Sequence, residues 1–167
     1  MKFFLIIGIL FFSCSNKIDL SYDGVNFGYP ITIKQLNQNV ELKYFPYEGI
    51  KGQSSNYRIE IQLKGLSDNW WDCDWCDIQD YRDEEIKGII FYQKNGNIDA
   101  LKNKLEDQYK SHWREIVSDS MMVSLLSLNN QTSIVLFKKQ ENLCVAFYYK
   151  VNENEIMGYV KGVKARR

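Results

Sequence analysis

The sequence contains little proline, little histidine and no excess of either charge. It has two prolines and one histidine in 167 residues, and 21 basic side chains balance 21 acidic ones. Because a nucleic-acid-binding surface needs a clustered basic excess, we predict no nucleic-acid partner. A structural zinc site needs four ligands, mostly from cysteine and histidine. With His112 as the only histidine and four cysteines in the chain, we predict no metal site and no cofactor.

The first distinctive feature that is present is a short apolar leader. The chain opens M-K-F-F-L-I-I-G-I-L-F-F-S-C, and nothing more polar than Gly8 interrupts the run from Phe3 to Phe12. A helix of that length rises about 15 Å, which is half the thickness of a bilayer core. We therefore predict that residues 1–13 are a secretory signal peptide and not a transmembrane helix. Ser13 places a small residue directly before Cys14.

In this segment the chain resembles a bacterial lipoprotein precursor, in which a small residue precedes a cysteine that becomes the lipidated N-terminus. The resemblance implies that Cys14 is the lipid attachment site and that the protein is anchored at a membrane of the cell envelope. Ser15 stands where an aspartate would signal inner-membrane retention in some bacteria, so the outer membrane is favoured over the inner one. A plain secreted protein is the alternative. We expect residues 14–23 to be a polar tether.

The remaining chain, residues 24–167, predicts a single α+β domain. Residues 57–64 alternate apolar and polar side chains, which is typical of a half-exposed antiparallel strand. Residues 88–93 are apolar throughout, as in a more central strand. Further strands are expected over 123–128, 133–138 and 143–150, the last two forming a hairpin around a short polar connection.

Two helices are expected beside these strands. Thr32 and Gln35 have the spacing of a capping box, which predicts a short N-terminal helix. Asn97 can cap the main helix, expected over 98–111 because its apolar residues fall on one face. The tail from Asn152 is expected to be loosely held. We predict a two-layer α+β fold with an antiparallel sheet of about five to seven strands.

The segment N-W-W-D-C-D-W-C-D, residues 69–77, contains a CxxC pair, Cys73 and Cys76. A redox-active pair needs a lowered thiol pKa, whereas the neighbouring aspartates disfavour the thiolate. In an oxidising compartment the pair can instead form a disulfide. We favour a disulfide between Cys73 and Cys76, and pairing of either one with Cys144 stays open. If neither pairs with it, Cys144 should be a buried free thiol, because it lies in an apolar strand.

The same segment is the best candidate for a binding surface. Three tryptophans and two aspartates are the candidate contacts: Trp70, Trp71, Trp75, Asp72 and Asp74. The tryptophans can equally be core residues, and the sequence does not decide between the two interpretations. The acidic residues fail the EF-hand pattern, so a solvated acidic loop is expected and not a calcium site. For His112, at the end of the main helix, a structural role is favoured over a catalytic one.

These observations favour a non-catalytic function. The hypothesis is a membrane-anchored lipoprotein that binds an envelope protein, a toxin that it neutralises, or a glycan. The alternative is an envelope thiol–disulfide oxidoreductase that uses Cys73 and Cys76. No catalytic constellation is recognisable in the sequence, so we predict no catalytic residue.

Overall fold

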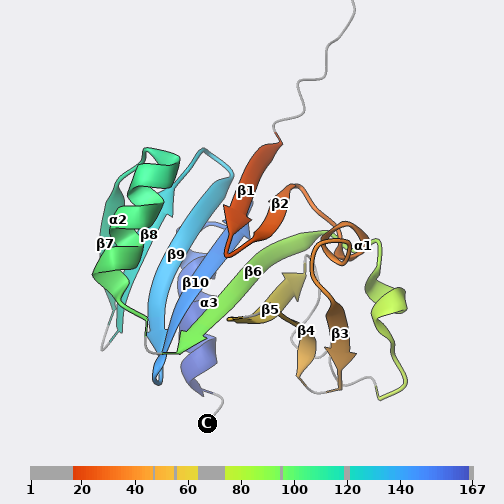
Figure 1. Ribbon diagram of the computed structural model, residues 1–167. Helices are drawn as coiled ribbons and strands as arrows, with labels where there is room; N and C mark the ends of the chain where they lie inside the picture. Colours follow the sequence, from red (N-terminus) through yellow and green to blue (C-terminus); the bar gives the residue numbers. More distant parts are fainter. Residues whose placement is uncertain are drawn as a thin grey trace, which may run out of the picture.

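The computed structural model describes residues 17–46, 48–54, 56–63, 74–94, 96–118 and 121–165. Within this part of the chain, an eight-stranded antiparallel sheet, a separate two-stranded hairpin and two main helices form an α+β fold (Figure 1). The strands are β1 (Ile18–Tyr22), β2 (Val25–Tyr29), β3 (Leu42–Phe45), β4 (Gly49–Gln53), β5 (Arg58–Leu63), β6 (Ile86–Lys94), β7 (Trp113–Ser118), β8 (Met121–Ser127), β9 (Thr132–Lys139) and β10 (Asn142–Tyr149). The helices are α1 (Ile33–Leu36), the 3-10 helix η1 (Ile78–Tyr81), α2 (Ile98–Tyr109) and α3 (Glu153–Ala165).

The large sheet has the strand order β3-β4-β5-β6-β10-β9-β8-β7. The apolar run expected to be central is β6, which pairs with β5 on one side and with β10 on the other. The predicted β9–β10 hairpin is confirmed. On β5 the apolar side chains are buried and those between them are not, as the alternation predicts. The strand count exceeds the prediction of five to seven.

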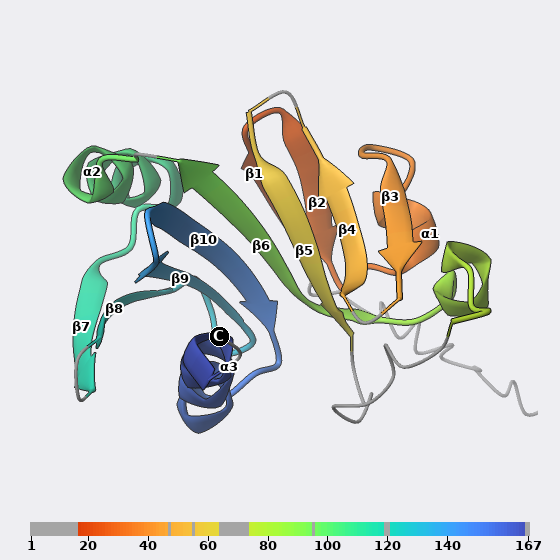
Figure 2. The same ribbon diagram turned by 90° about the horizontal axis from the view of Figure 1, so that it is seen from below.

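The central strands are buried on both faces of the sheet. On β6, Ile89 and Phe91 belong to one apolar cluster, whereas Ile90 and Tyr92 belong to a second cluster on the opposite face. The β1–β2 hairpin and α2 pack on the first face, and α3 packs on the second (Figure 2). The predicted two-layer arrangement is therefore wrong, since the sheet is the middle of three layers.

The N-terminal hairpin lies where a tether was expected. β1 begins at Ile18, so the fold starts inside the segment 14–23 and not at residue 24. The hairpin turns at Asp23 and Gly24, both with positive φ. Alternate side chains of its two strands face the first apolar cluster, with at most 5% of each exposed: Leu20, Tyr22, Val25, Phe27 and Tyr29. The hairpin is thus part of the core.

Both predicted helix starts are confirmed. Thr32 caps α1 through a capping box with Gln35, and Asn97 caps α2 by accepting from the backbone of Asp99 and Ala100. α2 ends at Tyr109, two residues before the predicted end, because Lys110 adopts the left-handed conformation.

The tail from Asn152 is not loosely held, as was expected, but folds as α3. Asn152 Oδ1 accepts from Glu155 N, and Glu155 Oε2 accepts from Asn152 N, so the helix starts with a reciprocal cap. Ile156 and Val160, four residues apart, are 1% and 0% exposed against the second face of the sheet. No helix in the described ranges is long and apolar enough to cross a membrane.

Candidate functional site

The structure describes only the end of the predicted binding segment. Trp70, Trp71, Asp72 and Cys73 lie outside the described residues. Trp75 is 87% exposed, so this side chain faces solvent and is not a core residue. Asp74 beside it is exposed too.

The 3-10 helix η1 begins three residues after the exposed Trp75. Asp77 is the N-cap of η1: its side chain accepts from Ile78 N, and its own backbone N–H donates to Asp80 Oδ2 over 2.8 Å. Tyr81, at the end of η1, stacks on Tyr44 of β3 with ring centroids 5.4 Å apart. The two aspartates therefore stabilise the local backbone, and the tyrosine pair fixes η1 to the edge of the sheet.

Backbone hydrogen bonds then fix the following residues to the α1 region. Lys34 N donates to Arg82 O over 2.8 Å, and Ile86 N donates to Ile31 O over 2.9 Å. In Figures 1 and 2, η1 accordingly lies beside α1, at the β3 end of the sheet. Trp75 thus lies shortly before a segment that is held to the rest of the fold at these two places.

The stretch of chain that contains Trp75 is acidic. Five exposed carboxylates lie within ten residues of it: Asp74, Asp77, Asp80, Asp83 and Glu84. Arg82 is the one basic residue in this stretch, and its Nε lies 3.7 Å from Asp83 Oδ2. Among the residues that the structure describes, no group of three or more His, Cys, Asp or Glu side chains could hold a metal ion. An exposed indole beside negative charge is suited to contact with a partner, since tryptophan is enriched among residues that dominate binding energy.

The cysteines are in two different states. Cys76 is disulfide-bonded, whereas Cys144 is free and buried on β10. Pairing of Cys144 with either cysteine of the CxxC pair is therefore wrong, and the expectation of a buried free thiol is confirmed. Burial raises the pKa of Cys144 to about 12, so this thiol is protonated at neutral pH. The Cys73–Cys76 pairing stays a prediction, because Cys73 lies outside the described residues.

His112 lies in the link between α2 and β7. Its side chain is 97% exposed, and its Nδ1 is 3.4 Å from Glu106 Oε1. Glu106 also accepts from the backbone N–H of Trp113, so it joins the end of α2 to the start of β7. This arrangement is structural in character, and among the described residues His112 contacts none of the other predicted site residues.

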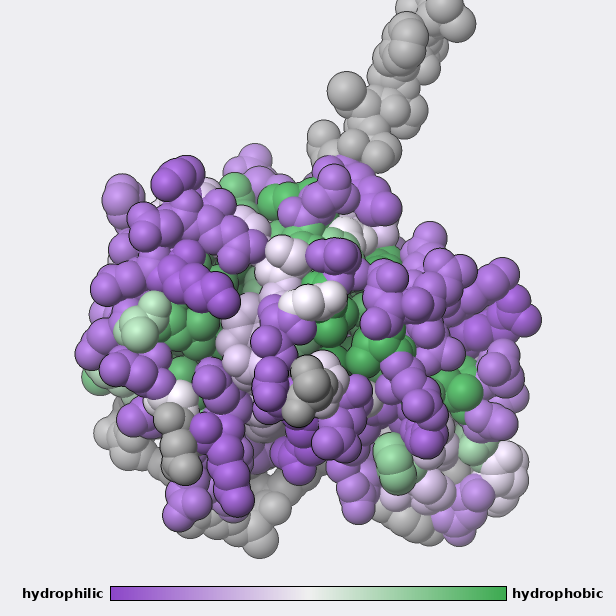
Figure 3. Space-filling model, viewed as in Figure 1, coloured by the Kyte–Doolittle hydropathy of each residue, from purple (hydrophilic) through white to green (hydrophobic). Residues whose placement is uncertain are grey.

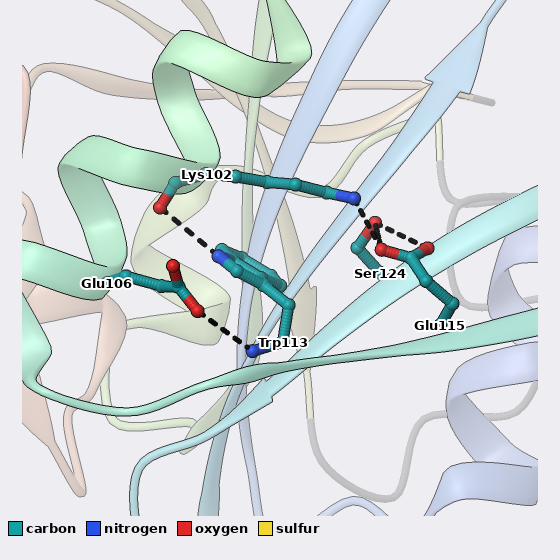
Figure 4. A network of polar contacts seen from close by, with 5 residues as sticks. All are labelled: Lys102, Glu106, Trp113, Glu115 and Ser124. Atoms are coloured by element: carbon teal, nitrogen blue, oxygen red, sulfur yellow. Dashed lines mark hydrogen bonds and ion pairs between the residues drawn. The ribbon is translucent and has the colours of Figure 1, made fainter.

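A buried serine, a carboxylate and a lysine meet where α2 packs on the sheet (Figure 4). Ser124 Oγ lies 2.9 and 3.0 Å from the two oxygens of Glu115, which also forms an ion pair with Lys102. Trp113 Nε1 donates to Lys102 O over 3.1 Å. Ser124 is 1% exposed, so a substrate cannot reach its hydroxyl. The network holds α2 against β7 and β8.

Glu115→Gln should destabilise the protein at neutral pH by roughly 0.5–1 kcal/mol. Charged hydrogen bonds contribute more than neutral ones, but the Glu115 side chain is 40% exposed, so solvent screens its ion pair. Partial burial alone would raise the pKa of Glu115, but hydrogen bonds from Lys102 and Ser124 lower it below its usual value. The contribution is therefore present above pH 4.5 and is lost as the pH falls through the pKa of the folded state. Urea unfolding at pH 7 and pH 3 checks this. An equal difference between wild type and variant at both pH values would contradict it.

A hollow of about 610 Å³ lies between the β1–β2 hairpin and α1, and part of its lining comes from the segment that was predicted to be the tether. Its polar lining includes Lys17, Asp19, Asn26, Gln35, Gln38 and Asn39. The sequence did contain a signal for the hairpin, since Asp23-Gly24 is flanked by alternating apolar residues. No local pattern indicated the hollow itself, because its two walls come from different elements.

On the face seen in Figure 3, the described residues show only small, separated hydrophobic areas between hydrophilic side chains. The chain matches no protein-family model, and no curated protein or solved structure shows significant similarity to it.

Proposed function

We propose that this protein is a lipid-anchored binding protein of the cell envelope that contacts its partner through Trp75 and the acidic residues around it. The observation that supports the binding surface is the 87% exposure of Trp75. Leaving a large indole in water forgoes the free energy of its burial, about 1.5–3 kcal/mol for large apolar side chains. A partner that covers the ring would recover this free energy on binding.

The proposed anchor is a lipid on Cys14, which follows the apolar leader 1–13. Because β1 begins at Ile18, only three residues separate this cysteine from the fold. Extended chain spans at most about 3.6 Å per residue, so the first strand begins within roughly 14 Å of the lipidated residue. The domain would therefore lie close to the membrane surface, the outer membrane by the resemblance of the leader.

The charge around Trp75 favours a partner with a basic surface, such as an envelope protein or a toxin that the protein neutralises. A glycan that stacks on the indole is the second class of partner. The alternative function, a thiol–disulfide oxidoreductase, has less support, because Asp74 and Asp77 lie beside Cys76 and negative neighbours disfavour a thiolate.

A photo-crosslinking amino acid at position 75 tests the proposed surface in intact cells. The matched control position is 112, whose side chain is 97% exposed and which precedes β7, at the opposite end of the sheet from η1. We expect a discrete crosslinked species from position 75 and none from position 112.

Trp75→Ala should weaken capture of that crosslinked partner by tenfold or more, since truncating a central tryptophan commonly costs about 2 kcal/mol or more of binding free energy. The free energy of unfolding of the Trp75→Ala variant should differ from that of the wild type by less than about 0.5 kcal/mol, because the Trp75 side chain is exposed. Affinity measurements and urea unfolding on the same samples check both values. Equal capture by wild type and Trp75→Ala would reject this surface, even if the lipid anchor were established.

A further inference from the structure

The hollow beside the hairpin contains two opposite charges over one glycine. A methyl group built on Gly28 would lie 2.8 Å from Lys17 Cε and 3.2 Å from Asp19 Oδ1. Gly28 therefore allows both side chains to cross the hairpin closely at this point. Although the two side chains are near each other, neither the Lys17 ammonium nor the Asp19 carboxylate has an ion-pair or hydrogen-bond partner among the described residues. Within the part of the chain that the structure describes, the hollow thus has a cation and an anion close together, each without a partner.

Carboxamide side chains form the rest of the polar lining. Asn39 Nδ2 donates to Asn26 O over 2.8 Å, which joins the end of α1 to β2. Gln35 Oε1 accepts from Thr32 N over 2.9 Å, so this side chain is held by the capping box. The Gln38 side chain is exposed and has no hydrogen-bond partner in the described ranges. Carboxamides both donate and accept hydrogen bonds, so they suit a ligand that contains both kinds of group.

We propose that this hollow binds a zwitterionic phosphoethanolamine headgroup, with the phosphate at Lys17 and the ammonium at Asp19. A lysine ammonium binds phosphate as a point charge, and a carboxylate accepts the N–H bonds of an amine. A ligand with only negative charge would be repelled by Asp19, and one with only positive charge by Lys17. The volume of about 610 Å³ lies in the usual range of small-molecule sites.

The source of this headgroup is the membrane. This assignment rests on the lipid anchor of the proposed function. Lys17 is three residues from Cys14, a span of at most about 11 Å. A lipid on Cys14 would therefore keep the hollow at the level of the headgroups. Binding there would orient the domain on the membrane and leave Trp75, at the β3 end of the sheet, for the partner.

The test titrates the full chain, purified from membranes into maltoside micelles, with water-soluble glycerophosphoethanolamine. Side-chain amide NMR signals of Asn26 and Gln38 report on the hollow directly. Glycerophosphocholine has no N–H to donate, and glycerol 3-phosphate has no ammonium, so both should bind at least about tenfold more weakly. Lys17→Gln and Asp19→Asn should each weaken binding about tenfold. Lys104→Gln and Asp107→Asn, at exposed positions of α2, should leave it unchanged.

Amide signals that do not move, glycerol 3-phosphate binding as tightly as glycerophosphoethanolamine, or an Asp19→Asn variant of full affinity would each overturn the site. Intact-mass analysis of the same sample separates this outcome from failure of the anchor. A lipid on Cys14 without headgroup binding rejects the site and keeps the anchor. Headgroup binding with an unmodified Cys14 rejects the membrane as the source of the ligand.

Discussion

Cys14→Ser is expected to abolish incorporation of an alkyne-labelled fatty acid into the protein and to remove its stable attachment to membranes. Serine has no thiol, so a lipid bound through the cysteine sulfur cannot form. A single acyl chain gives only marginal membrane binding, whereas several chains on one residue anchor a protein stably.

The matched control for this experiment is Cys144→Ser. Cys144 is free and buried, and burial keeps it protonated by raising its pKa to about 12. This variant should therefore retain the label in full. Cells grown with the labelled fatty acid, followed by fluorophore coupling and gel analysis, give the comparison. The mass of the wild-type protein should correspond to a chain that begins at Cys14 plus its acyl groups. Label on Cys14→Ser, or an unmodified wild-type mass, would refute the anchor.

Local signals in the sequence predicted local structure well. The Thr32–Gln35 capping box and the Asn97 cap were read correctly because each depends on residues within one helical turn. The alternation along β5 and the apolar run of β6 were likewise sufficient to identify strands. In these elements the side-chain pattern and the tertiary environment favour the same structure.

The errors arose where pairing or packing over long distances decides the structure. β4 contains Gly49 and Gly52, which disfavour a strand locally, and it forms by pairing with β3 and β5. α3 depends on the apolar second face of the sheet, which Ile156 and Val160 cover. The helical spacing of the apolar residues in α3 is present in the sequence. The polar and basic residues around them made this segment resemble a loosely held tail.

The candidate site was only partly predictable. The sequence placed Trp75 in an acidic loop. It predicted neither the 87% exposure of this side chain nor the Tyr44–Tyr81 contact that fixes the neighbouring η1 to the sheet. The hollow joins Asn26 of β2 to Asn39 after α1, so no single stretch of sequence contains it.

Phe147→Ala should cause the largest loss of stability among the single substitutions considered for this protein. Phe147 lies on β10 at the centre of the sheet and is fully buried. Its ring centroid is 5.1 Å from that of Phe27 and 5.8 Å from that of Tyr22, both on the hairpin. On the sheet side it lies 5.9 Å from Phe91 of β6. One ring therefore joins the hairpin to the two central strands.

Removing this ring should lower the free energy of unfolding by about 3–5 kcal/mol, the usual cost of truncating a buried phenylalanine. Part of the loss is the edge-to-face contacts, each worth about 0.5–1.5 kcal/mol beyond area burial. The control is Phe45→Ala on the edge strand β3. Its side chain is 41% exposed, so the loss should stay within about 1 kcal/mol. Urea unfolding of both variants gives the two values, and equal losses would contradict the central role of Phe147.

Phe147→Ala also tests whether the β1–β2 hairpin is part of the core or only connects the anchor to the sheet. If the hairpin depends on Phe147, hydrogen exchange at the backbone of Phe27 should accelerate in Phe147→Ala more than exchange in α3, which packs on the opposite face. Acceleration of equal size in both elements would mean that the cavity weakens the whole sheet evenly. Because Asn26 and Gly28 flank Phe27 and line the hollow, a loosened hairpin should also reduce headgroup binding. Phe45→Ala should leave both hydrogen exchange at Phe27 and headgroup binding unchanged.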